Sequence, residues 1–293
     1  MNFLILGAGG MAGHTTAIYL AERGHSVTAL TRTPFPYGRF IQGDVKDVPF
    51  LKGVLAAGEY DVVVNSVGVL NQDAERDKSL AVWLNGYLPH LLSELTRGTS
   101  ARVLHISTDC VFSGRTGGYF ENSPRDGDTF YDRSKAMGEL ENGKDLTFRT
   151  SLVGPDLKPE GIGLFNWFMK QQGRIKGYSR AIWTGVTTVV LARAIERASE
   201  SGLAGLYHLV YGEPISKLDL LTLFNEYFRD GELDITPEPS VAADKSLRNS
   251  RTDFSFQVPS YRAMVEEMKQ WVEAHAELYP HYSGTPGAQN GQE

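Results

Sequence analysis

The N-terminal stretch "NFLILGAGGMAGH" (2–14) constrains the fold more than any other feature of this chain. An apolar run at 3–6 leads into three glycines spaced G-x-x-G-x-x-G, and a helical pattern of apolar residues follows. In such a strand–loop–helix unit, Gly7 makes the tight turn, Gly10 lets the backbone approach a pyrophosphate, and Gly13 lets the helix pack closely on the sheet. The free N–H groups and positive dipole end of the helix favour a phosphate. This stretch therefore predicts a dinucleotide-binding turn.

Short apolar segments alternate with helical patterns through the first half of the chain. The predicted strands are 3–6, 25–32, 39–45, 61–68, 102–108 and 146–151, and the predicted helices after the first are 48–58 and 74–97. The strands are apolar throughout, which is typical of a parallel sheet covered on both faces. Alternating strands and helices imply right-handed crossovers. We expect an α/β fold with a doubly wound parallel (Rossmann) sheet.

The alternation loosens after residue 151, where Gly and Pro become frequent. We expect a smaller, mostly helical C-terminal substrate-binding lobe at 155–185 and 212–280, with 1–154 and 186–211 forming the NAD(P)-binding domain. Residues 281–293 are rich in Gly, Gln and Pro and are predicted to be disordered. Ligands of open α/β sheets bind beyond the carboxyl ends of the strands, so this lobe would form the second wall of a cleft.

Composition excludes several classes of function. The net charge of −6, without a Lys/Arg cluster, argues against a nucleic-acid partner. A single cysteine fits a reducing compartment and excludes an internal disulfide framework. No apolar run is long enough for a membrane span, and the seven histidines lack metal-ligand spacing. We expect a cytoplasmic protein with no metal site, and a homodimer is the commonest assembly for such a chain.

The end of the second predicted strand bears on the choice of dinucleotide. NAD sites often place an acidic residue there to hold the ribose 2′-hydroxyl. This chain has Thr31 and Arg32 instead, and Arg32 could pair with a 2′-phosphate. The sequence favours NADPH, with NADH as the alternative. Asp44, after the third strand, could accept a hydrogen bond from an adenine amine or could cap the next helix.

Hydroxyl, phenol and amine side chains recur around the fifth predicted strand. Ser107 and Thr108 lie at its carboxyl end, and Tyr131 precedes Lys135 by one helical turn in "YDRSK". A Y-x-x-x-K pair alone is as readily a solvated surface pair. Its agreement in order and placement with the glycine loop and Thr108 favours a catalytic group.

These stretches resemble the extended short-chain dehydrogenase/reductase superfamily, and within it the dTDP-4-dehydrorhamnose reductase group of sugar-nucleotide reductases. The resemblance covers residues 1 to about 275 and is carried by "LILGAGGMAGH", "VVNSVGV", "HISTDCVFSG", "YDRSKAMGE", "FRTSLVGP", "AIWTGVTTVVLARAI" and "GLYHLV". The group usually has tyrosine where Cys110 stands in this chain.

The resemblance implies NADPH-dependent reduction of a 4-keto nucleotide sugar for surface polysaccharide synthesis. Tyr131 would protonate the developing alkoxide, and Thr108 would hold its oxygen. A phenol has an unperturbed pKa of about 10, and the nearby Lys135 ammonium would lower it by favouring the phenolate. Lys135 would also hydrogen-bond the nicotinamide ribose.

The same resemblance assigns further residues to the two ligands. The expected cofactor contacts are Gly7, Gly10, Met11, Gly13, Thr31, Arg32, Asp44, Val45, Ser66, Val67, Gly68 and Lys135. The expected substrate contacts are Asn85, Ser107, Asp109, Arg149 and Trp183. Each substrate contact has an ordinary structural alternative, such as core packing for Trp183.

Two other functions stay open at the level of sequence. One is an epimerase of the same superfamily that retains NAD. The other is a non-catalytic, dinucleotide-binding regulatory subunit, which would have no need of Thr108, Tyr131 and Lys135. A related dehydratase typically carries Asp-Glu after the threonine, whereas this chain has Asp109-Cys110.

Overall fold

A parallel seven-stranded sheet forms the larger layer of the computed structural model, which describes residues 1–35 and 37–282. Its order is β10-β6-β5-β4-β1-β2-β3, and all neighbours are parallel. The strands are β1 (Asn2–Leu6), β2 (Ser26–Thr31), β3 (Arg39–Gln42), β4 (Val62–Asn65), β5 (Arg102–Ser107), β6 (Leu146–Arg149) and β10 (Gly205–His208). The strand order reverses between β1 and β4, which confirms the predicted doubly wound Rossmann sheet.

Helices cover both faces of this sheet, as the continuously apolar strands predict. Phe3 and Ile5 of β1 belong to one core cluster, which includes α1 and α8, while Leu4 and Leu6 belong to the other, which includes α2 and α5. These helices are α1 (Met11–Glu22), α2 (Val48–Ala57), α5 (Leu88–Leu95), α6 (Phe130–Met137) and α8 (Thr188–Glu200). Because alternate residues bury on opposite faces, neither side of the sheet remains open to water.

The helix predicted over 74–97 is broken into four pieces. They are α3 (Asn71–Arg76), α4 (Lys78–Ala81), a π-helical segment η1 (Val82–Tyr87) and α5. Pro89 has no N–H to donate to the Asn85 carbonyl, so regular α-helical bonding cannot continue there. A Cβ added at Gly138 would lie 1.9 Å from that carbonyl oxygen, so the end of α6 packs against the widened turn.

A second layer contains a sheet that the sequence did not predict. Its strand order is β11-β8-β12, with β11 (Ile215–Ser216) antiparallel to β8 (Arg174–Trp183) and β12 (Asp234–Asp244) parallel to it. The accompanying helices are α7 (Leu164–Met169), α9 (Lys217–Arg229) and α10 (Tyr261–Ala274). The C-terminal layer is therefore mixed rather than mostly helical.

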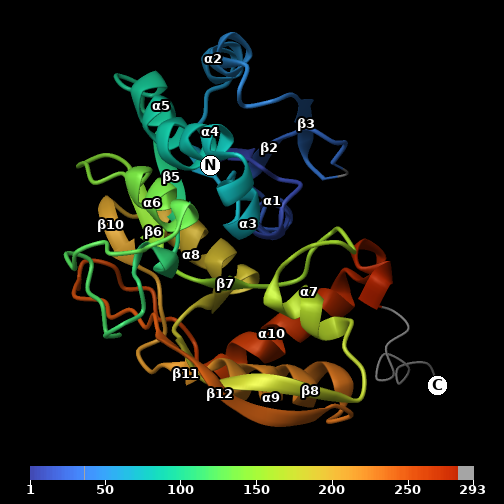
Figure 1. Cartoon of the computed structure of the whole chain (residues 1–293). Coiled ribbons are helices and arrows are strands. Elements are labelled where there is room, and N and C mark those ends of the chain that lie inside the picture. Colours follow the sequence, from blue (N-terminus) through green and yellow to red (C-terminus); the bar gives the residue numbers. More distant parts are fainter. Residues whose placement is uncertain (36, 283–293) are drawn as a thin grey trace.

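The two layers lie at opposite ends of the molecule, with the short β7 (Leu152–Val153) between them (Figure 1). β7 pairs with β9 (Val186–Thr187), and one core cluster runs from β1 through Phe165 of α7 to Phe224 of α9. This continuous core holds the second layer against the carboxyl edge of the larger sheet.

The chain ends, within the described residues, on two 3-10 turns, η3 (Ala276–Leu278) and η4 (Pro280–Tyr282). Tyr282 is buried, with its ring centre 5.5 Å from that of Phe165. His281 and Tyr282, assigned to a disordered tail from sequence, thus have defined structure, because the tyrosine packs on the core. Residues 283–293 of that predicted tail lie outside the described residues. No helix in 1–35 and 37–282 combines the length and apolar character needed to cross a membrane.

Candidate active site

The glycine loop has the geometry that each glycine was predicted to provide. Gly7 has φ +80°, a conformation that favours glycine, and its carbonyl accepts from the Gly10 N–H at 2.9 Å. A Cβ added at Gly13 would lie 2.2 Å from the Gly7 carbonyl oxygen, whereas one at Gly10 would meet no atom nearer than 3.4 Å. Gly13 thus permits close packing, and Gly10 leaves the backbone open to a ligand.

The start of α1 fits a pyrophosphate. Gly10 is its N-cap and offers no side-chain hydrogen bond, and the first turn has no acidic residue. Unsatisfied N–H groups there attract an anion. Met11 lies beside the loop that precedes α7, because a Cβ added at Gly163 would lie 3.1 Å from the Met11 sulfur. The predicted Met11 contact therefore lies where the two layers meet.

The end of β2 carries no carboxylate. Thr31 is buried, and a Cβ added at Gly9 would lie 3.0 Å from its hydroxyl oxygen. Arg32 is exposed and makes no ion pair with any residue in 1–35 and 37–282. This arrangement suits a 2′-phosphate better than a 2′-hydroxyl.

The remaining predicted cofactor residues follow β3 and β4. Asp44 caps its own turn, with Oδ1 accepting from the Lys46 N–H at 2.9 Å, and Val45 is buried. The Ser66 hydroxyl donates to the Leu6 carbonyl at 2.6 Å and so ties β4 to β1. Val67 and Gly68 continue this edge: Val67 Cγ2 would lie 3.0 Å from a Cβ at Gly7, and a Cβ at Gly68 would lie 3.2 Å from Asn85 Oδ1. Their cofactor contacts stay predictions.

Thr108 stands at the carboxyl end of β5, where it caps the 3-10 turn η2 (Asp109–Val111). Its Oγ1 accepts from the Cys110 N–H at 3.1 Å and donates to Asp109 Oδ1 at 3.2 Å. Tyr131 and Lys135 lie one turn apart on α6, which begins with a capping box between Thr129 and Asp132. Because this box fixes the first turn of α6, it orients the phenol toward the end of β5.

Lys135 is buried beside the carboxyl end of β5. Its Nζ donates to the Ile106 carbonyl at 2.7 Å and lies 3.4 Å from His105 Nε2. Burial lowers the pKa of Lys135 to about 8, and the nearby Glu139 carboxylate opposes that shift. With this pKa the side chain is mostly an ammonium at neutral pH and loses its charge as the pH rises through about 8.

Tyr131 is buried, and burial raises the pKa of its phenol, with the negative influence of Cys110 adding to the shift and a hydrogen bond with Thr108 opposing it. The sequence predicted that Lys135 would lower this pKa. That prediction is wrong for this arrangement, because the ammonium donates to the Ile106 carbonyl instead. The phenol is therefore held in its protonated form, which is the form that donates a proton.

Asn85 was predicted to contact substrate, but the structure directs it inward. It is fully buried, its Oδ1 accepts from the Val69 N–H at 2.8 Å, and its Nδ2 donates to the Val69 carbonyl at 2.9 Å and to Ser134 Oγ at 3.0 Å. Ser134 in turn donates to the Tyr131 carbonyl at 2.9 Å. Asn85 is thus a brace that joins the loop after β4 to α6.

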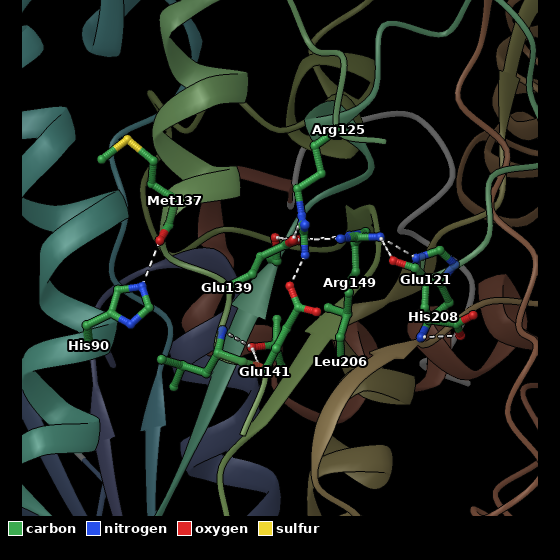
Figure 2. Close-up of polar contacts among 12 residues, drawn as sticks. His90, Glu121, Arg125, Met137, Glu139, Glu141, Arg149, Leu206 and His208 are labelled. Carbon is green, nitrogen blue, oxygen red and sulfur yellow. Dashed lines mark hydrogen bonds and ion pairs between the residues drawn. The ribbon is translucent and has the colours of Figure 1, made fainter. Parts of the chain in front are cut away.

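Ser107 and Arg149 were also predicted to contact substrate, and both bind Glu139 instead. Ser107 Oγ donates to Glu139 at 2.6 Å, and the Arg149 guanidinium donates to both of its oxygens at 2.7 and 2.6 Å. Figure 2 shows Glu139 between Arg125 and Arg149, with Arg149 reaching on to His208. These groups form a buried ion-pair network rather than a ligand surface.

The surroundings in this network favour a charged Glu139 and a neutral His208. Burial alone would raise the pKa of Glu139, yet its bonds with Arg149 and Ser107 lower it below the ordinary value. Burial and the adjacent Arg149 lower the pKa of His208 to about 4, so Nε2 is free to accept from the Arg149 Nη1 at 2.8 Å. A charged histidine there would repel the guanidinium.

Trp183 is also interior, with 2% of its surface exposed. Its ring lies 4.9 Å from the Lys217 ammonium, and its Nε1 has no hydrogen-bond partner among the residues described. Asp109 is buried, and its Oδ1 accepts a hydrogen bond from the Thr108 hydroxyl at 3.2 Å.

Sequence reasoning missed Glu139 and Lys217. Glu139 lies just beyond the end of α6, four residues after Lys135 in "KAMGE", so its closeness to Lys135 in the sequence was a usable signal. Lys217 comes from a distant helix, and nothing local to it predicts its neighbours. The His14 imidazole, in the first turn of α1, links the Gly10 carbonyl (2.9 Å) to the Tyr279 hydroxyl (2.8 Å).

Comparison with known proteins agrees with this geometry. A dTDP-4-dehydrorhamnose reductase of Burkholderia thailandensis is 30% identical over 224 residues, covering 71% of this chain and 72% of that protein. Other curated relatives align over less than half of their lengths.

The solved structures show the shared fold. A dTDP-4-dehydrorhamnose reductase of Bacillus anthracis, in complex with NADP, superposes with a TM-score of 0.78 at 20% identity, covering 93% of this chain and 99% of that one. A UDP-glucose 4-epimerase of Thermotoga maritima with UDP-glucose gives 0.76 at 16% identity, covering 94% and 100%. Fold similarity alone does not separate these reactions. Because the model of the family described as "RmlD substrate binding domain" matches residues 1–282, the chain belongs to that family.

Proposed function

We propose that this protein reduces a 4-keto group of a nucleotide sugar with NADPH, in the synthesis of a surface polysaccharide precursor. The observation that supports this function is that Thr108 and Tyr131 meet at the carboxyl end of β5, with Lys135 one turn along α6. The reductases among the relatives act on dTDP-4-dehydrorhamnose by their names, and a 4-keto nucleotide sugar is the corresponding substrate class for this chain.

The chain's own residues would handle the proton of this reaction. When bound, the reduced nicotinamide supplies a hydride to the carbonyl carbon. The Tyr131 hydroxyl gives its proton to the carbonyl oxygen, which completes a secondary alcohol, and then regains a proton from solvent. The Thr108 hydroxyl hydrogen-bonds the same oxygen as charge develops on it. Lys135 would hydrogen-bond the nicotinamide ribose, as the family resemblance implies.

Residues of the larger layer would hold the cofactor. The free N–H groups at the start of α1 would bind its pyrophosphate. Arg32 would pair with a 2′-phosphate, and the absence of a carboxylate at the end of β2 supports NADPH over NADH. The cytoplasmic location expected from the sequence is part of this proposal. The expected homodimer is also part of it.

The test is steady-state oxidation of NADPH with a panel of 4-keto nucleotide sugars. We expect turnover by the wild type and a loss of about 10²- to 10⁴-fold in Tyr131→Phe, because a positioned acid contributes that much. Tyr178→Phe is the matched control, since Tyr178 is 44% exposed on β8. Equal activity of Tyr131→Phe and wild type would refute the assignment of the acid. Purification with tightly bound NAD⁺ and no net NADPH oxidation would favour an epimerase instead.

A further inference from the structure

Two lysines of the C-terminal layer approach the turn that follows Thr108. Lys217 is the first residue of α9, and Lys245 directly follows β12. The Lys245 side chain lies against the loop after η2, because a Cβ added at Gly114 would be 2.9 Å from its Cγ. Both lysines act electrostatically on Asp109. The second layer thus places positive charge beside Asp109, at the carboxyl end of β5.

The Lys217 ammonium has no hydrogen-bond or ion-pair partner within residues 1–35 and 37–282. It lies over the Trp183 ring, 4.9 Å from the ring centre. Burial lowers the pKa of Lys217 to about 8, with Asp109 opposing the shift, so the group is charged at neutral pH. An ammonium has three donors, and those of Lys217, which is half-buried, are available to a ligand's acceptors.

A second polar group nearby is also without a partner. The Trp183 Nε1 is buried and has no acceptor within residues 1–35 and 37–282. Buried indole N–H groups usually find a hydrogen-bond partner. Lys217 and Trp183 are in contact, and each carries a donor without an acceptor in the described residues, which indicates a place where a ligand's oxygen atoms complete the hydrogen bonding.

Asp109, on which Lys217 acts electrostatically, supplies a hydrogen-bond acceptor. Its Oδ1 accepts from the Thr108 hydroxyl at 3.2 Å, and the Cys110 side chain also hydrogen-bonds the carboxylate, which has further acceptor capacity. Because the carboxylate is buried beside Thr108, a group bound to it would lie next to the reacting carbonyl.

We propose that Lys217 and Asp109 form a specificity pair that binds neighbouring hydroxyl groups of the sugar ring, with Lys217 donating to one and Asp109 accepting from another. This inference rests on the proposed function, because it assigns the substrate's sugar moiety to the same cleft. It selects keto sugars that carry hydroxyls beside the ketone over deoxygenated ones.

The charge of the pair argues for hydroxyl groups over the substrate diphosphate. Asp109 would repel a phosphate held by Lys217, whereas a neutral hydroxyl can donate to the carboxylate and accept from the ammonium. Trp183 supports the lysine from behind, so the ammonium keeps a fixed position over the ring face.

The test compares Lys217→Met with wild type. Methionine keeps an apolar stem against Trp183 but removes the donor. We expect KM for the nucleotide sugar to rise about 10- to 100-fold, because a hydrogen bond from a charged group is lost. The dissociation constant of NADPH should not change. Lys269→Met is the matched control on the exposed face of α10. Lys217→Gln is a second variant in case methionine impairs folding.

Inhibition constants for a nucleotide sugar and for the free nucleoside diphosphate identify the part of the substrate that Lys217 binds. The variant should lose affinity for a nucleotide sugar but not for the free nucleoside diphosphate, and it should no longer discriminate against a deoxygenated analogue. Unchanged KM, or equal loss for the free diphosphate, would overturn the inference. If wild type oxidises no NADPH with any keto sugar, the proposed function fails. Calorimetric binding of nucleotide sugars to both proteins then tests the pair by itself, and equal affinities would overturn it.

Discussion

Replacing Glu139 by Gln should strongly destabilise the folded protein, although the change removes only one charge. Both the Glu139 and Arg149 side chains are fully buried, and they are joined at 2.6 Å through Oε2 and Nη2. Removing one partner of such a pair costs about 3–5 kcal/mol, because the other charge is left uncompensated. Typical total stabilities are only about 5–15 kcal/mol.

The structure gives this cost a definite origin. Glu139 also accepts from Ser107 at 2.6 Å and from Arg125, so Gln can satisfy only part of the network. The folded-state pKa of Glu139 is lowered, so its contribution to stability is present above the unfolded pKa, about 4.3. That contribution disappears as pH falls through the folded pKa. Glu139→Gln should therefore lose this part of the acid dependence of stability.

Urea denaturation followed by tryptophan fluorescence measures the effect. We expect a lower midpoint with an unchanged m-value. Glu226→Gln, which breaks the exposed pair with Arg262, is the matched control and should leave the midpoint in place. Replacing both Glu139 and Arg149 by apolar residues should recover part of the loss. A loss for Glu139→Gln below about 1 kcal/mol, the value of an exposed pair, would refute the reasoning.

Three further predictions concern the cofactor site. Arg32→Asp should weaken NADPH binding by about 10- to 100-fold and spare NADH, because it replaces a charge-assisted contact by repulsion; equal KM values for both cofactors in wild type would contradict it. Gly13→Ala should cost about 1–3 kcal/mol in the free energy of unfolding and weaken cofactor binding, because its Cβ would lie 2.2 Å from the Gly7 carbonyl oxygen. Gly53→Ala is its control, with no atom within 4 Å of the added Cβ, and a midpoint for Gly13→Ala like that of this control would refute the steric argument. Finally, kcat/KM should fall as pH rises through about 8, because the Lys135 ammonium is lost; a profile that stays flat to pH 10, near the ordinary lysine pKa of about 10.4, would contradict this.

The sequence predicted the larger sheet well because its signals are local. Apolar strands, the glycine spacing and the i,i+4 pair of Tyr131 and Lys135 each depend on neighbouring residues alone. The break in the helix over 74–97 is explained by Pro89, whose missing N–H disrupts regular bonding. The resulting π-helical turn depends on α6 packing against it, which no local pattern predicts.

The three-stranded sheet was missed for physical reasons. β12 contains Pro237 and Pro239, which argue against a strand, yet an edge strand tolerates proline. β8 is partly exposed, and it contains charged residues and Gly177. Neither segment shows the apolar run that identifies a buried strand.

The site residues also differ in whether a local sequence signal indicates their position. Thr108 and Asp109 follow a strand end, and the structure joins them by a hydrogen bond there, while their catalytic and substrate roles stay predictions. Ser107 and Arg149 also lie at strand ends, but they face the interior, and the sequence does not distinguish a polar side chain that faces a ligand from one that binds Glu139. The Lys217 contact with Trp183 depends on how α9 packs against β8, two elements that are separated in the sequence.

The most direct test of the central claim uses NADPH deuterated at the transferred position of the nicotinamide. With a 4-keto nucleotide sugar as substrate, mass spectrometry should find one deuterium in each released sugar nucleotide and one NADP⁺ formed for each. Replacement of Tyr131 by Phe should suppress both together. A released sugar without deuterium, or isomerised without net oxidation of NADPH, would contradict the assignment of Thr108, Tyr131 and Lys135 to carbonyl reduction.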